Sequence, residues 1–426
     1  MTKLTGTIAA FLMQIVLARI LGANNFGDYI YVITWINFLT LFGKLGFEVA
    51  SIKFVAIYKS NGQWGLLRGF MKRTFQIVLI LSSLSAVLLL AGIYFLSLDD
   101  TLTPNLVQLF MIAAPLLVLL SLVQTQSGVL RGLGAVIKAL APQSILYPLI
   151  IIIFICLINF YNGLQVTTLA AILVTIVACS LIAFLQYFYI FNLRPEQLNN
   201  IKQQFSIHEW LGTSLAMAVT SGGQVLLKQL DIIIIGIMLG TKQAGIYAVA
   251  TRFANLTKFG LQAVNTASAP IFAKIYSQKK SGDLQKAVSD AAKLNFLISF
   301  PLVTLLLVFA GSFLQFFGHE FSAGTIIIQI LLLGEFVNII SGSNGLILNM
   351  SGFQNQLAKI IFGVVITYFI LLVVFIQLWQ MEGAAIATVS VQVLRNVIGT
   401  SMVWSYIGIN PTLFSRYLWI SNKGLN

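Results

Sequence analysis

Long apolar runs with almost no charged residues fill most of this sequence, and they leave it one kind of fold. The run from 105 to 130 contains no Asp, Glu, Lys or Arg. Only 9% of the whole chain is charged, whereas a soluble domain carries about 25% charged residues. A soluble enzyme, a disordered protein and a secreted disulfide scaffold are therefore excluded. Since about 20 apolar residues span a bilayer, we predict an all-α integral membrane protein of about twelve transmembrane helices.

The edges of the apolar runs give the expected helices. Two of the runs are too long for one straight crossing. Gly43 and Gly46 interrupt the first of them, and Gly260 and Pro270 interrupt the second. Each is expected to bend into a cytoplasmic amphipathic piece. The expected helices are 3–21, 28–57, 70–97, 105–130, 139–160, 164–191, 210–239, 246–276, 292–317, 323–349, 357–379 and 384–407.

Lys and Arg occupy alternate connections between these helices. The other connections contain one cation, Lys242. Because cytoplasmic loops of membrane proteins carry the excess of Lys and Arg, both termini are predicted to be cytoplasmic. The net charge of +13 is explained in this way, and no nucleic-acid partner is expected. The cations of the basic connections are Lys59, Arg68, Lys72, Arg73, Arg131, Lys138, Arg194, Lys202, Lys274, Lys279, Lys280, Lys286, Lys293 and Lys359.

The sequence also repeats itself at an offset of 218 residues. Leu21-Gly22 and Tyr29 recur as Leu239-Gly240 and Tyr247, and Asn37 recurs as Asn255. The pattern predicts two parallel six-helix repeats, and transporters built in this way bind substrate between the halves near the midplane. In this register Met1 matches Val219, so the first helix is expected to begin later than its counterpart. The predicted ranges are 1–191 for the first bundle, 192–209 for a cytoplasmic linker, 210–407 for the second bundle and 408–426 for a cytoplasmic tail.

A family resemblance lies in these same segments. The stretch Leu17 to Gly22 followed by Phe26 to Tyr29, and the stretch Gly383 to Thr388, resemble polysaccharide biosynthesis proteins. These include the O-antigen-type flippases of the multidrug/oligosaccharidyl-lipid/polysaccharide superfamily. The resemblance implies two bundles forming a V around a central cavity, in the bacterial cytoplasmic (inner) membrane. It further implies flipping of an undecaprenyl-diphosphate-linked sugar unit, with a polysaccharide polymerase and glycosyltransferases as partners.

Ionisable residues at membrane depth cost ~2.5–3.5 kcal/mol each, so they are candidates for function. Lys228, Lys258, Glu335 and Arg395 lie near the midplane, each about 12 residues, at about 1.5 Å per residue, from the outer end of its helix. Arg252 is shallower, Arg19 is near the outer rim, and Lys44 and Glu48 lie toward the cytoplasm.

Pairing among these charges is the simplest alternative to function. Lys44 and Glu48 have i,i+4 spacing and Lys228 and Asp231 have i,i+3 spacing, while Glu335 has Lys258 or Arg395 as a partner. If each of the three acids pairs with one of the six cations, three cations are left without an acid. A surplus of buried cations requires water or a bound anion, and a diphosphate suits Arg and Lys. The predicted substrate-binding residues are Lys44, Lys228, Arg252, Lys258 and Arg395, with the amides Asn37, Asn255 and Gln262, whose alternative role is interhelical hydrogen bonding.

The energy source and the reaction class follow from the acids and the motifs. Asp231, Glu335 and Glu48 are the candidate sites for a coupling proton or sodium ion. No nucleotide-binding, metal-binding or hydrolase motif is present, so no cofactor, metal or enzymatic activity is expected. The predicted function is a flippase that works by alternating access. The alternatives are a MATE-like drug/cation antiporter, which would offer acids to its cargo, and a non-transporting membrane scaffold.

Overall fold

The structure is a computed structural model that describes residues 2–99, 102–162, 166–198, 201–278 and 280–414. Within these ranges the regular structure is helical. Nine helices of the described residues are long and apolar enough to cross a membrane, by length and composition. These features confirm an all-α, multi-pass membrane protein, while the exact number of crossings stays a prediction. Part of the predicted tail (415–426) and Lys279 lie outside the described residues.

The chain forms two compact units, Met1–Gln229 and Leu230–Asn426. Unit 1 comprises α1 (Thr2–Lys44), α2 (Phe47–Ser60), α3 (Trp64–Leu98), α4 (Pro104–Gly132), α5 (Val136–Ala141), η1 (Pro142–Leu146), α6 (Tyr147–Asn162), α7 (Thr168–Leu193), η2 (Glu196–Leu198) and most of α8 (Ile207–Met238). The predicted linker 192–209 and the first part of α8 thus belong to unit 1. The predicted domain ranges themselves stay predictions.

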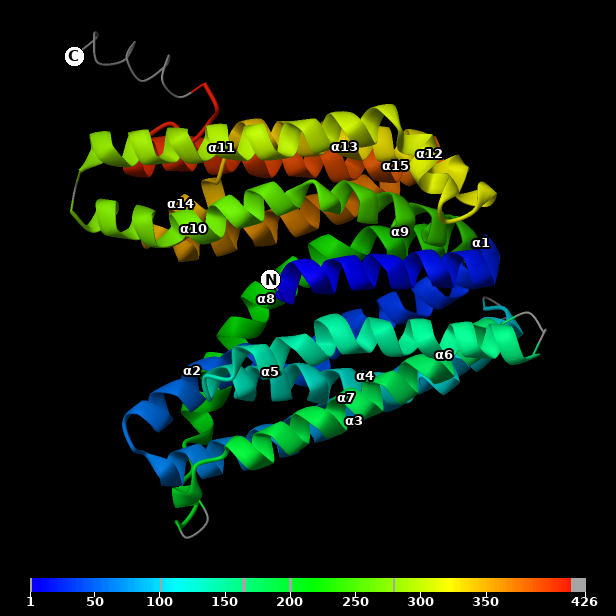
Figure 1. The fold of residues 1–426 in the computed structure, drawn as a ribbon, viewed down its shortest axis with the longest axis horizontal. Helices are drawn as coiled ribbons and strands as arrows, with labels where there is room; N and C mark the ends of the chain where they lie inside the picture. The colour runs from blue at the N-terminus through cyan, green and yellow to red at the C-terminus, as the bar shows by residue number, and fades with distance from the viewer. Residues whose placement is uncertain (1, 100–101, 163–165, 199–200, 279, 415–426) are drawn as a thin grey trace. The chain divides into compact units, whose positions relative to one another are not determined.

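Unit 2 begins within α8 and contains the remaining helices. They are α9 (Thr241–Leu256), α10 (Lys258–Ser277), α11 (Ser281–Val308), α12 (Ala310–Gln315), η3 (His319–Gly324), α13 (Thr325–Ser341), α14 (Asn344–Met350) and α15 (Gln354–Ile407). Helix α13 packs against α15, α11 and α9, and α10 packs against α11 and α14. Figure 1 shows α10, α11, α13 and α15 as a layered bundle.

Two expected loops are kinks within continuous helices. Helix α1 passes the predicted outer connection with one non-helical residue, Gly22, whose φ is 72°. Helix α15 likewise continues through a predicted connection, with two non-helical residues, Trp379 and Gln380. Glycine adopts positive φ without steric cost, so a single Gly22 redirects the chain without the loop that polar residues 22–28 suggested. The expected bend of the second apolar run is a break at Leu45 and Gly46, after which α2 begins.

Helix α4 lies at the centre of unit 1, where it packs against α7, α3, α1 and α2 (Figure 1). Gly128 and Gly132 are spaced by four residues and face α2. A Cβ at Gly128 would overlap the backbone of Glu48, and one at Gly132 would crowd Ser51 and Val55. Small residues at this spacing let two helix backbones approach closely within a membrane. The close approach fixes α2, and with it Glu48, against α4.

The segment before α8 is attached to unit 1 by its backbone. The Gln204 N–H donates to the Gly65 carbonyl at 3.0 Å, and Arg68 donates to the Ile201 carbonyl at 2.7 Å. The buried indole of Trp210 donates to the Tyr58 hydroxyl at 2.8 Å and packs on Phe70. These contacts hold the start of α8 against α2 and α3.

Candidate functional site

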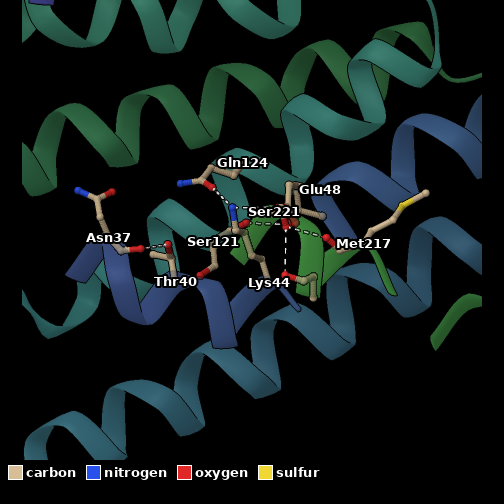
Figure 2. Close-up of polar contacts among 10 residues, drawn as sticks. Asn37, Thr40, Lys44, Glu48, Ser121, Gln124, Met217 and Ser221 are labelled. Atoms are coloured by element: carbon tan, nitrogen blue, oxygen red, sulfur yellow. Dashed lines mark hydrogen bonds and ion pairs between the residues drawn. The ribbon is translucent and has the colours of Figure 1, made fainter. Parts of the chain in front are cut away.

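The first cluster of predicted site residues lies in unit 1, where α1 ends and α2 begins. Lys44 Nζ is 3.0 Å from the Glu48 carboxylate and donates to Gln124 Oε1 of α4 at 2.7 Å, as Figure 2 shows. Both charged side chains are only 9% exposed. The second oxygen of Glu48 has no hydrogen-bond donor among the described residues. Arg131 of α4 interacts with Glu48 electrostatically, so two cations act on this carboxylate.

The second cluster lies in unit 2 and joins α9, α10, α13 and α15. Lys258 Nζ is 3.0 Å from the Glu335 carboxylate and donates to Asn255 Oδ1 at 2.8 Å. Glu335 is buried, with 5% of its side chain exposed, while 36% of the Lys258 side chain is exposed. Arg395 of α15 acts on Glu335 electrostatically. Lys258, Asn255, Glu335 and Arg395 were predicted from sequence, and the fold brings all four together.

Amide side chains extend this second cluster. Asn338 Nδ2 donates to the other oxygen of Glu335 at 3.3 Å. Asn396 Nδ2 of α15 donates to Asn338 Oδ1 at 3.2 Å, and both asparagines are buried. Neither asparagine was predicted from the sequence. Their signal was an amide three residues after Glu335 and another directly after Arg395.

The third cluster surrounds Asp231, which is 5% exposed near the end of α8. Its carboxylate accepts from the Ile232 N–H at 2.8 Å and interacts electrostatically with the hydroxyls of Tyr247 and Tyr368. Both tyrosines bond to the Thr388 hydroxyl, at 3.0 Å and 2.8 Å. The cluster therefore places a carboxylate among three hydroxyl groups.

The remaining predicted residues lie apart from these clusters or at their edges. Arg252 of α9 is exposed and acts on Asp231 electrostatically. Asn37 donates to the Ile33 carbonyl of its own helix at 2.9 Å, which is a structural role. Gln262 and Lys228 are exposed. No described residues group three or more His, Cys, Asp or Glu side chains in the way that a metal site requires.

Comparison with known families and structures defines the class of protein. The sequence profile of the polysaccharide biosynthesis protein family matches residues 1–276, and that of the MatE family matches residues 216–381. No curated protein matches the sequence of the chain significantly. Several solved structures share the fold at low sequence identity.

A multidrug resistance MATE family transporter of the MOP superfamily, in an inward-facing conformation, gives a TM-score of 0.78 at 14% identity over 95% of this chain and 94% of its own. The lipid II flippase MurJ, in an inward closed conformation, gives a TM-score of 0.70 at 16% sequence identity. The match covers 94% of this chain and 86% of the MurJ chain. A MATE structure in the bent conformation gives a TM-score of 0.62 at 16% sequence identity. The match covers 96% of this chain and 94% of the MATE chain. The fold is therefore that of the MOP-superfamily transporters. The profile of the polysaccharide biosynthesis protein family matches more than half of the sequence. The chain therefore belongs to this family, as its sequence signatures indicated.

Proposed function

We propose that this protein flips undecaprenyl-diphosphate-linked oligosaccharide units from the cytoplasmic to the outer leaflet for surface polysaccharide synthesis. It does so by alternating access with a cationic cavity in the bacterial inner membrane, with both termini in the cytoplasm. Membership of the polysaccharide biosynthesis family supports the substrate class. The polymerase and the glycosyltransferases of the same pathway are its expected partners.

The partly exposed side chain of Lys258 is the observation that carries this proposal. It is fixed by Glu335 and Asn255, yet 36% of its side chain stays exposed on a helix predicted at membrane depth. Lys228 and Arg252 are exposed as well. Exposed cations at this depth are stable beside water or an anionic ligand, and a diphosphate is an anion that suits both Lys and Arg. Lys44 is only 9% exposed in its pair with Glu48, which supports a structural role for that lysine more than substrate contact.

Replacement of the cations tests the proposal directly. Lys228, Lys258 and Arg395 are changed singly to Ala, and surface polysaccharide is measured at matched protein levels. We expect export to fall at least about tenfold for Lys258→Ala, because loss of a charged phosphate contact of ~1.5–3 kcal/mol weakens binding by that order. The matched control is Lys242→Ala, which removes a cation from an exposed pair with Glu320. Normal export in all three variants would contradict the proposal.

A MATE-like drug/cation antiporter is the second candidate, favoured by the MatE profile over residues 216–381. Such a carrier presents accessible acids to its cationic cargo. Here Glu335 and Glu48 are buried against lysines, which supports the anionic substrate. Transport of a cationic dye that persists in Lys258→Ala and is lost in Asp231→Asn would favour the antiporter.

For energy coupling we propose Asp231 among the three candidate acids. In unit 1, Tyr29 and Thr175 form a 3.0 Å hydrogen bond like that of Tyr247 and Thr388 in unit 2. At the repeat offset Tyr247 corresponds to Tyr29, whereas Asp231 corresponds to an apolar residue, Met13. Carboxylate and hydroxyl oxygens suit a proton or a sodium ion.

Removal of the Asp231 charge tests the coupling role. We expect Asp231→Asn to keep substrate binding and to abolish the acceleration of flipping by a proton or sodium gradient in proteoliposomes. The measurement is the flipping rate of a labelled lipid-linked sugar with and without each gradient. A variant that responds to the gradient like the wild type would show that the coupling ion binds elsewhere.

A further inference from the structure

A stripe of exposed polar side chains runs along α9 and α10 in unit 2. Its members are Arg252, Asn255, Gln262 and Thr266, and all four are exposed. Their spacings of three, seven and four residues place them on one face of a helix. Thr257, which separates α9 from α10, keeps helical dihedral angles (φ −65°, ψ −21°), so this face continues from one helix into the next. We call these four residues the polar stripe.

The opposite face of α10 is the one that packs within unit 2. Gly260, Val264 and Phe272 are buried there, and α10 contacts α11 and α14. Gly260 lies so close to α11 that a Cβ would overlap the Ser299 hydroxyl. This packing fixes the rotation of α10 and leaves the polar stripe exposed. Amide and hydroxyl groups that face lipid lack hydrogen-bond partners, so at the predicted membrane depth they are stable only where water or a ligand reaches them.

The side chains of the polar stripe that carry no charge keep free hydrogen-bonding capacity. Within the part of the chain that the structure describes, the Gln262 carboxamide forms no hydrogen bond. The Thr266 hydroxyl donates to the Gln262 carbonyl at 2.7 Å, which leaves its oxygen able to accept. Pro270 has no N–H to donate to the Thr266 carbonyl four residues before it, so that carbonyl lacks its usual helical bond. These groups suit the hydroxyl and acetamido groups of a sugar.

We propose that Gln262 and Thr266 bind the sugar that adjoins the diphosphate of the lipid-linked substrate. The proposal rests on the proposed function, in which Lys258 binds the phosphate. Gln262 follows Lys258 by one helical turn, about 6 Å along α10, and Thr266 follows by two. A phosphate at Lys258 therefore places the next group of the substrate beside these two side chains. No Asp, Glu, Lys or Arg lies between Lys258 and Lys274, so the contacts in this stretch are those of uncharged polar groups.

The test compares two probe lipids that differ by one sugar. Undecaprenyl diphosphate lacks the sugar, and undecaprenyl-diphosphate-N-acetylglucosamine carries it. The affinity of the full-length protein in nanodiscs is measured for each probe. The quantity compared between variants is the ratio of the affinity for the sugar-bearing probe to the affinity for the bare probe. A change in folding or in the phosphate contact alters both affinities, whereas a lost sugar contact alters only their ratio.

The two uncharged residues of the polar stripe are changed singly. Gln262→Leu and Thr266→Val remove polar atoms and keep similar side-chain volumes. We expect each change to lower the ratio at least about threefold, because each removes a neutral hydrogen bond to the sugar. The matched control is Gln278→Leu, the same substitution at an exposed position where α10 ends. This control is expected to bind both probes like the wild type.

Two results would overturn the sugar site. One is a wild-type ratio in both Gln262→Leu and Thr266→Val. The other is an equal loss of affinity for both probes, because that loss would place the effect at the phosphate or in the fold.

The proposed function fails in a different way. Lys258→Ala is expected to weaken the binding of both probes, and wild-type affinity for both would overturn the proposed function and this inference with it. Loss of both affinities in Lys258→Ala, together with a wild-type ratio in the two stripe variants, would overturn only the sugar site.

Discussion

At the scale of single residues, burial decides what each charge can do. The side chains of Lys44 and Glu48 are paired and each is 9% exposed. The Lys258 side chain is 36% exposed, although its partner Glu335 is buried. A fully buried pair is costly to break, because removal of one partner leaves the other charge without compensation. The two lysines therefore have different expected roles, although both lie in apolar helices beside an acid.

Removal of the Lys44 charge is predicted to destabilise unit 1. Lys44→Met leaves Glu48 buried without its counter-ion, and we expect a loss of about 3 kcal/mol in the free energy of unfolding. The double variant Lys44→Met/Glu48→Leu removes both charges and should recover most of that loss. Unfolding midpoints of the purified variants in detergent measure the effect. If Lys44→Met alone matches the wild type, the pair is not structural.

Sequence alone revealed the charges and part of their pairing. The spacing of Lys44 and Glu48 indicated their contact, and Glu335 had two possible partners, of which Lys258 forms the ion pair. The amides that complete each cluster, Gln124 and Asn338, were beyond prediction. An amide in an apolar run looks the same in sequence whether it holds a charged group or bonds to its own helix, as Asn37 does.

At the scale of elements, glycines set how closely the helices approach. Gly46, with a φ of 79°, lets the backbone of α8 approach where α2 begins, since a Cβ there would overlap the Ser214 carbonyl. Gly69 on α3 does the same for the Gln204 carbonyl. The apolar runs predicted helices in these segments, but they gave no sign that the polar linker packs on α3. Backbone contacts of this kind do not depend on side-chain type.

A pair of glycine substitutions on α3 tests the packing of the linker. Gly69→Ala places a methyl group against the Gln204 carbonyl, and we expect about 1–3 kcal/mol of destabilisation from the displaced segment. Gly92 on the same helix has nothing within 4 Å of such a methyl group, so Gly92→Ala should be neutral or stabilising by up to about 1 kcal/mol. Equal unfolding midpoints for the two variants would contradict the close approach.

At the scale of the whole molecule, the distribution of charge along the chain gives the expected orientation in the membrane. Nearly all predicted loop cations occupy alternate connections, which predicts their cytoplasmic location. The family and the fold agree with the resemblance drawn from sequence signatures. The repeat and the ranges of its halves stay predictions.

The orientation is testable by cysteine labelling. In a background with Cys156 and Cys179 replaced by Ala, we expect Asn61→Cys to react with an impermeant maleimide only after the cytoplasmic side is opened. Thr103→Cys, at an exposed position in a predicted outer connection, should react in intact cells. The reverse pattern of labelling would contradict the predicted cytoplasmic termini.

Flipping of a labelled undecaprenyl-diphosphate sugar in proteoliposomes tests the central claim, that exposed cations at membrane depth carry the phosphate head. The wild type and Lys242→Ala are expected to move the lipid between leaflets at similar rates, and Lys258→Ala at least about tenfold more slowly. Flipping by Lys258→Ala at the wild-type rate would contradict the account.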